Sequence, residues 1–211
     1  MAVFTDDFDR ANAASLGVNW TEVGVNAFRI STNRSLGLTN KINFTHPAAL
    51  SPVAGMYVQV KIYDVGAAAH GIGCMLSAPA PSRLNGYGLK FMDDSFANMS
   101  LMKYINWSHH YTSGTRLGIA VPSPVRGDIV RLECIAGVSQ KVYINGVLKI
   151  SAADAVYTTG VPGLICSTAG GAFSKWNDFE AGDWPIPATG GAGSPFALGM
   201  EPGWNRNLGH P

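Results

Sequence analysis

The stretch VYINGVLKI, residues 142–150, consists of two short apolar runs joined at Asn145-Gly146. A two-residue turn needs positive φ at both central positions, and Asn and Gly tolerate this conformation best. The stretch therefore predicts a β-hairpin. The preceding segment, IVRLECIAG (129–137), also alternates apolar and polar residues and ends in glycine. We expect strand 129–135 to pair with the hairpin through a loop at 136–140.

Strand patterns of the same kind fill the chain from residue 20 to residue 182, as short runs separated by Gly, Pro, Asn or Ser. In MYVQVKIYDV (56–65), one face carries Tyr57, Gln59, Lys61 and Tyr63, and the other carries Val58, Val60 and Ile62. This period of two predicts a sheet with one wetter face. Apolar residues nowhere follow a helical period over ten or more positions. The sequence therefore predicts an all-β, antiparallel two-sheet sandwich.

The composition limits the possible partners. The chain has 211 residues, of which 46% are hydrophobic and 14% are charged, with a formal net charge of +1. This is enough for one sizeable core, but there is no basic excess to bind nucleic acid. No apolar run approaches the roughly 20 residues that span a bilayer. The three cysteines, Cys74, Cys134 and Cys166, lack metal-ligand spacing, so we expect them to be buried and reduced.

The composition changes after residue 182. Residues 184–211 hold six glycines and five prolines, which do not fit regular sheet or helix. The same segment carries apolar residues that are unusual for a solvated linker: Trp184, Ile186, Phe196, Leu198, Met200, Trp204 and Leu208. We therefore expect a β-sandwich over 1–182 and an extended arm over 183–211. The arm would bury these anchors against a neighbouring copy or on its own domain, and the first case predicts a homo-oligomer.

Three segments resemble parts of concanavalin A-like (laminin-G-like) jelly rolls. DDFDRANAASLGVNWTEVG (6–24) resembles their opening strand, residues 130–164 their paired central strands, and GAFSKWNDFEAG (171–182) their closing strand. The resemblance covers residues 4–182 and implies a jelly roll whose closing strand pairs with its first strand.

Such domains with a bare Met start and a Gly/Pro-rich tail are similar to minor tail and other virion proteins of bacteriophages. This likeness implies a structural protein of a phage tail or a decoration component, bound to other virion proteins and found in the particle after synthesis in the host cytoplasm. The first residues, MAVFTDDFDR, carry acids where a signal peptide would carry basic and apolar residues, which agrees with this expectation.

The sequence gives no sign of catalysis. Glycosidases that resemble this fold type need two carboxylates on one strand, usually as Glu-x-Asp-x-(x)-Glu, and the chain has no such run. Asp178 and Glu180 share a strand face, but we expect Phe179 between them to enter the core and leave both acids solvated. No Gly-x-Ser-x-Gly motif occurs either. We therefore predict that the chain is not an enzyme.

Carbohydrate binding is the alternative function. Sugars are bound by aromatic faces, with amides and carboxylates on their hydroxyl groups. The segments NGYG and NWSHHY, on strands expected to be neighbours, supply such residues: Asn85, Tyr87, Asn106, Trp107, His109, His110 and Tyr111. Packing of these residues in the core or in a subunit interface is the competing interpretation.

Calcium is a weaker candidate ligand. The run TDDFD provides hard oxygen donors at Asp6, Asp7 and Asp9, which calcium accepts. Acids before a short turn also serve as backbone caps, and no EF-hand pattern is present. We otherwise expect no cofactor.

Overall fold

The computed structural model describes residues 2–23, 28–32, 34–37, 43–64, 70–78, 83–91, 98–107, 114–166 and 175–184. Within these ranges the chain forms strands and no helix, as predicted. The first strands are β1 (Val3–Asp6), β2 (Trp20–Val23), β3 (Phe28–Ile30), β4 (Ser35–Gly37), β5 (Asn43–Pro47), β6 (Gly55–Asp64), β7 (His70–Ser77) and β8 (Leu84–Lys90). They are followed by β9 (Asn98–Trp107), β10 (Thr115–Pro122), β11 (Ile129–Ile135), β12 (Ser139–Ile144), β13 (Val147–Ala152), β14 (Val161–Cys166) and β15 (Lys175–Asp183). No helix in the part of the chain described is long and apolar enough to cross a membrane.

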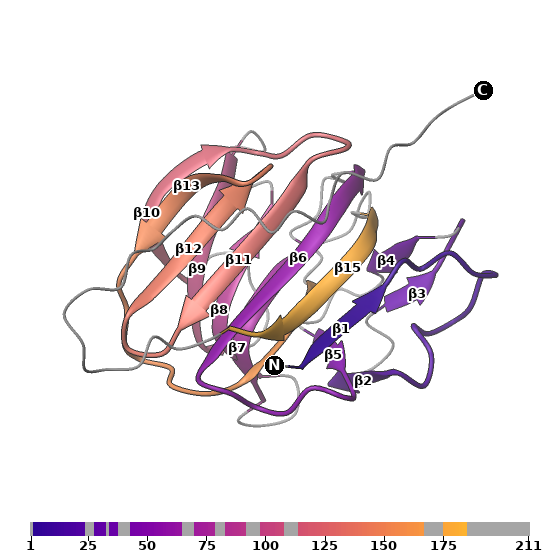
Figure 1. Ribbon diagram of the computed structural model, residues 1–211, viewed down its shortest axis with the longest axis horizontal. Coiled ribbons are helices and arrows are strands. Elements are labelled where there is room, and N and C mark those ends of the chain that lie inside the picture. The colour runs from indigo at the N-terminus through magenta and orange to yellow at the C-terminus, as the bar shows by residue number, and fades with distance from the viewer. Residues whose placement is uncertain are drawn as a thin grey trace.

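The strands form two antiparallel sheets that pack face to face (Figure 1). Sheet A has the order β13-β12-β11-β6-β15-β4-β3, and β1 also pairs with β15. Sheet B has the order β10-β9-β8-β7-β14-β5-β2. The prediction of an all-β two-sheet sandwich is confirmed.

The opening stretch forms the hairpin expected from Asn145-Gly146. The two residues adopt φ values of 51° and 76°, which fit a turn with positive φ at both central positions. β12 pairs with β13 on one side and with β11 on the other. The partner strand 129–135 is therefore confirmed, although its loop is shorter than predicted because β12 already begins at Ser139.

The first and last strands lie side by side. Val3 pairs with Gly182 and Asp6 pairs with Phe179 in the antiparallel ladder of β1 and β15. The resemblance to jelly rolls predicted this pairing, which is confirmed. β15 also pairs with β6, so the closing strand lies between the N-terminal strand and the middle of sheet A.

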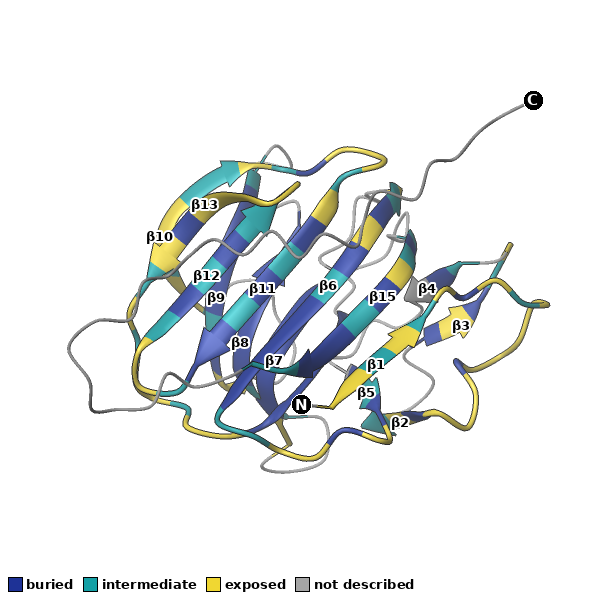
Figure 2. Cartoon of the chain, in the orientation of Figure 1, coloured by how far each residue is buried: buried dark blue, intermediate teal, exposed yellow. Residues whose placement is uncertain are grey.

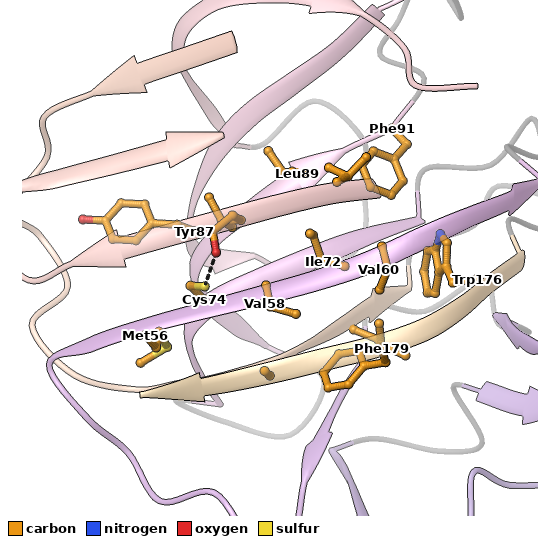
Figure 3. Close-up of a cluster of buried hydrophobic side chains, with 14 of the residues drawn as sticks. Met56, Val58, Val60, Ile72, Cys74, Tyr87, Leu89, Phe91, Trp176 and Phe179 are labelled. Atoms are coloured by element: carbon orange, nitrogen blue, oxygen red, sulfur yellow. Dashed lines mark hydrogen bonds between the residues drawn. The ribbon is translucent and has the colours of Figure 1, made fainter. Parts of the chain in front are cut away.

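Alternate residues of each sheet fill one core between the sheets. In Figure 2, β6 begins with four buried residues, and from Val58 onward buried residues alternate with half-buried or exposed ones, as they do along most of β11. Figure 3 shows Val58 and Val60 of β6, Ile72 of β7, Leu89 of β8 and Trp176 of β15 meeting inside the sandwich. Burying apolar area at about 25 cal/mol per Å² is the main force that joins the sheets.

The predicted burial of the cysteines is confirmed where the structure describes their side chains. Cys74 of β7 and Cys134 of β11 are free and fully buried. Burial, together with the neighbouring Cys74 thiol, raises the pKa of Cys134. The side chain of Cys166 lies outside the described residues.

Candidate functional site

The outward side of sheet A carries polar and aromatic side chains along one surface, although one of them, Tyr57, is only 5% exposed. Because Val58, Val60 and Ile62 point into the core, the alternate residues of β6 point outward. Outward residues of β11, β12 and β15 extend the same surface. We call this surface the polar face of sheet A, and it comprises Tyr57, Gln59, Lys61, Tyr63, Arg131, Glu133, Lys141, Tyr143, Glu180 and Trp184.

Arg131 is the centre of one cluster on the polar face. Its guanidinium carbon lies 4.0 Å from the centroid of the Tyr57 ring and 4.8 Å from that of Trp184. The Tyr57 hydroxyl donates to Glu180 Oε1 over 2.7 Å, and Arg131 Nε donates to Glu133 Oε1 over 2.8 Å. Burial and the bond to Glu180 raise the pKa of the Tyr57 phenol, so it stays protonated and can donate. These contacts hold the aromatic and charged groups in fixed positions.

Strand register places a polar row across four strands of this face. Gln59 of β6 lies opposite Glu180 of β15 and Arg131 of β11, and Arg131 lies opposite Tyr143 of β12. Gln59, Tyr143 and Glu180 are half-buried, so part of each side chain meets solvent. Burial and the neighbouring Glu133 carboxylate raise the pKa of Tyr143. The row thus offers a ring face, an amide and a carboxylate along one line.

The structure brings together two of the residues predicted to bind carbohydrate. Asn85 Oδ1 accepts the backbone N–H of Asn106 over 2.7 Å, at the end of sheet B where β8 and β9 pair. Tyr157 contacts the same atom at 3.4 Å, and Arg83 donates to the Asn106 carbonyl. The side chain of Trp107 and the residues His109, His110 and Tyr111 lie outside the described residues.

Tyr87 has a structural role in the core rather than a place on the surface. It is fully buried, and its hydroxyl donates to Asp154 Oδ1 over 2.7 Å. Asp154 Oδ2 also accepts Lys103 Nζ over 2.5 Å, and the Asp154 carbonyl accepts Gln140 Nε2. A ring inside the core has no face to offer a sugar, so the predicted carbohydrate contact at Tyr87 is not retained.

The calcium candidate also has a structural role at its first residue. Both carboxylate oxygens of Asp6 accept the Arg10 guanidinium, at 2.6 and 2.9 Å, and Asp6 Oδ2 accepts Trp20 Nε1 at 2.7 Å. Asp7 accepts the backbone N–H of Asp9. Among the residues that the structure describes, no three His, Cys, Asp or Glu side chains gather as metal ligands. The carboxylate oxygens of Asp6 are thus engaged by Arg10 and Trp20, and calcium binding stays a prediction.

The first predicted anchor of the arm packs on its own domain. The Trp184 ring contacts Tyr57 edge-on at a centroid distance of 6.1 Å, and its backbone N–H donates to the Gly55 carbonyl. The other predicted anchors, Ile186, Phe196, Leu198, Met200, Trp204 and Leu208, lie outside the described residues.

No protein-family model and no curated protein sequence matches the chain, whereas solved structures do. The carbohydrate-binding module CBM66 from Bacillus subtilis matches with a TM-score of 0.57 and 16% identity, over 80% of this chain and 98% of that one. The VIP36 exoplasmic/lumenal domain in its Ca2+/Man3GlcNAc-bound form matches with a TM-score of 0.60 and 10% identity, over 89% and 93% of the two chains. A Bacillus licheniformis β-glucanase matches with a TM-score of 0.56 and 10% identity, over 87% and 99%. The fold is that of lectin-like jelly rolls. At these identities the likeness shows the fold alone.

The sequence indicates only part of the polar face. Its period of two places the outward residues of β6 on one wetter side but marks no binding site there. The period of two in 129–135 also sets Arg131 and Glu133 apart from Val130 and Leu132, so the signal for these two residues was present. What the sequence did not show is that β11, β6 and β15 are neighbours.

Proposed function

We propose that this chain is a non-enzymatic carbohydrate-binding module and that glycan lies on the polar face of sheet A. The observation that carries the proposal is the row of Tyr143, Arg131, Gln59 and Glu180 with Trp184 beside it. Half-buried rings can stack on the apolar C–H side of a sugar, and the amide and carboxylates can bind its hydroxyl groups.

Similar structures support carbohydrate as the class of ligand. One of them is named as a carbohydrate-binding module, and another is a lumenal domain described in a glycan-bound form. A module of this fold with an aromatic and amide-bearing sheet face fits the same chemistry.

The environment of the two carboxylates favours binding over hydrolysis. Glycoside hydrolysis needs one carboxyl group as acid and another as nucleophile or base at the same bond. On the polar face, Glu133 accepts from Arg131 and Glu180 accepts from Tyr57, and the two glutamates lie on strands separated by β6. A β-glucanase shares the fold, so turnover of the bound glycan is the assay that would contradict this part of the proposal.

The test is a glycan array followed by calorimetry with the polysaccharide that binds best. Replacing a stacking ring in Tyr143→Ala or Trp184→Ala should weaken binding about two- to tenfold, from the roughly 0.5–1.5 kcal/mol of an aromatic contact. Ile119→Ala is the matched control, because Ile119 is 86% exposed on β10 at the edge of sheet B.

Trp107→Ala decides between the two candidate positions. Loss of binding in this variant, with Tyr143→Ala unchanged, would move the glycan to the end of sheet B near Asn85 and Asn106. Failure of the unmodified chain to bind any polysaccharide would refute the proposed function itself.

The role as a structural component of a bacteriophage particle, with copies associating through the arm, stays a prediction. Its support is the composition of residues 184–211. Mass spectrometry of purified particles, and the solution mass of a chain ending at Trp184, would test it. If the truncated chain keeps the same number of copies per assembly, the assembly role of the arm is contradicted.

A further inference from the structure

A pocket of about 400 Å³ opens at one end of the polar face of sheet A. It is lined by Tyr63, Asp64, Pro124, Val125 and Arg126. Tyr63 and Asp64 end β6, while the other three residues belong to the turn between β10 and β11. The volume falls within the roughly 300–1,000 Å³ of small-molecule sites. The pocket therefore continues the proposed glycan surface.

Two arginines stack on the tyrosine of this pocket. The guanidinium carbons of Arg126 and Arg34 lie 4.2 and 4.4 Å from the centroid of the Tyr63 ring. Stacking uses the flat face of a guanidinium group and leaves its N–H groups in the plane. In-plane N–H pairs bind a carboxylate through two parallel hydrogen bonds. Because Arg126 also lines the pocket, its guanidinium lies where it can bind a carboxylate placed there.

The turn that carries Arg126 is held in place from two sides. Gly127 donates its backbone N–H to the Ile62 carbonyl over 2.8 Å. The Asp128 carboxylate accepts the Val125 N–H and the side-chain amide of Asn145, each over 2.8 Å. Because both oxygens of Asp128 are engaged, this acid is a fixed part of the turn. Arg126 consequently sits on a rigid support.

The acid inside the pocket restricts the kind of ligand. Asp64 lines the pocket beside Arg126, and its carboxylate can accept hydroxyl groups but repels a simple anion. Further along the face, Lys61 lies 3.6 Å from Asp178 and is paired there. A ligand for this pocket must offer an anionic group to Arg126 and hydroxyl donors to Asp64. Sugar acids carry both groups on one ring.

We propose that this pocket is a subsite for a carboxylate-bearing sugar, with Arg126 binding the carboxylate and Asp64 the neighbouring hydroxyls. This inference rests on the proposed carbohydrate-binding function and names its ligand class. The adjoining sugars of the chain lie along β6, over Lys61 and Gln59.

The experiment compares polygalacturonate with its fully methyl-esterified form, which keeps the sugar ring but loses the charge. Binding of the full chain to each polymer is measured by calorimetry, with dextran sulfate as a polyanion without carboxylates. Polygalacturonate should bind more tightly than the ester. Arg126→Gln should weaken that binding roughly ten- to a hundredfold, as expected when a hydrogen bond to a charged group is lost. Lys149→Gln, the same charge change at an exposed site of β13, should have no effect.

Four results would overturn the subsite. Equal affinity for acid and ester, unaffected by Arg126→Gln, would leave carbohydrate binding intact and remove the subsite. An equal loss in Lys149→Gln would show general charge attraction. Dextran sulfate binding as tightly through Arg126 would make the pocket a general anion site. If the chain binds neither polygalacturonate nor its ester, this ligand class is excluded. Only a failure to bind every glycan of the array would refute the proposed function as well.

Discussion

Removing the Asp154 carboxylate should destabilise the fold. Asp154 lies between β13 of sheet A and β14 of sheet B, where the chain crosses from one sheet to the other. Its carboxylate accepts Tyr87 and Lys103 of sheet B, and its carbonyl accepts Gln140 of sheet A. The residue therefore links the two sheets at this edge.

The magnitude follows from the burial of the ion pair. The side chains of Lys103 and Asp154 are only 15% and 11% exposed. Breaking a fully buried pair by removing one partner costs about 3–5 kcal/mol. Because this pair is only partly buried, we expect about 2–3 kcal/mol, the range for losing hydrogen bonds to a charged group. Asp154→Ala should lower the free energy of unfolding by that amount. Adding Lys103→Met removes the stranded ammonium group, so the two changes should show a coupling energy of about 2 kcal/mol.

Urea unfolding followed by tryptophan fluorescence suits this measurement, because Trp20 and Trp176 are buried in the core. The four proteins of the cycle are the unmodified chain, each single variant and the double variant. A cost below about 1 kcal/mol for Asp154→Ala, or a coupling below about 0.5 kcal/mol, would refute the reasoning.

The same bonds make the stability depend on pH. Burial acts to raise the pKa of Asp154, but the hydrogen bonds from Lys103, Tyr87 and the Val156 N–H outweigh it and lower the pKa. Since the folded-state pKa lies below the unfolded value of about 3.9, the ionised carboxylate contributes fully above that pH. The contribution is lost as the pH falls through the folded pKa. Unfolding free energies measured from pH 6 down to pH 2 should fall less steeply for Asp154→Asn, and parallel curves would contradict this.

Three further changes test the fold at other points. Asn145→Gly keeps the positive φ but removes the hydrogen bonds to Asp128 and to the Ile129 N–H. The free energy of unfolding in urea should fall by about 1–2 kcal/mol. No change would mean that Asn145 is only a turn residue. Asp6→Ala removes the acceptor of Arg10 and Trp20 and should lower the free energy of unfolding by about 3 kcal/mol. The control Asp7→Ala, at an exposed residue, should lower it by less than about 0.5 kcal/mol. Equal losses in the two variants would contradict the geometry at Asp6. In a Cys166→Ser background, a thiol reagent should label the buried Cys74 and Cys134 only as fast as the chain unfolds, and rapid labelling of the native chain would show that the core is open.

Local sequence signals predicted the strands well because period-two alternation and turn residues depend only on neighbouring residues. They predicted the hairpin at Asn145-Gly146 and the inward side of β6. They also predicted that Phe179 enters the core, and it is 1% exposed. They missed the irregular points within strands, such as Met75 and Asp178, which adopt φ values of 55° and 47°. Met gives no sequence signal for positive φ, and Asp, although enriched there, is far more often found at negative φ, so neither bulge could be read from the sequence.

The candidate site was predicted less well because a ligand surface is built from residues far apart in the chain. Tyr87 looked like a sugar-stacking residue, yet the inward side of β8 places it under Asp154. Asn85 and Asn106 do meet, as expected for adjacent strands, but Tyr157 joins them from a segment that the sequence did not connect with them.

The sequence by itself determined which segments are strands, where the hairpin turns and which residues of β6 face outward, since these follow from local backbone preferences. Only the tertiary structure decided that β15 and β11 flank β6, which brings Glu180, Gln59, Arg131 and Tyr143 into one row. It also placed Trp184 on Arg131, and Arg126 on Tyr63. The physical reason is that strand order is set by how the inward faces pack into a common core, and outward residues become neighbours only as a consequence of that packing.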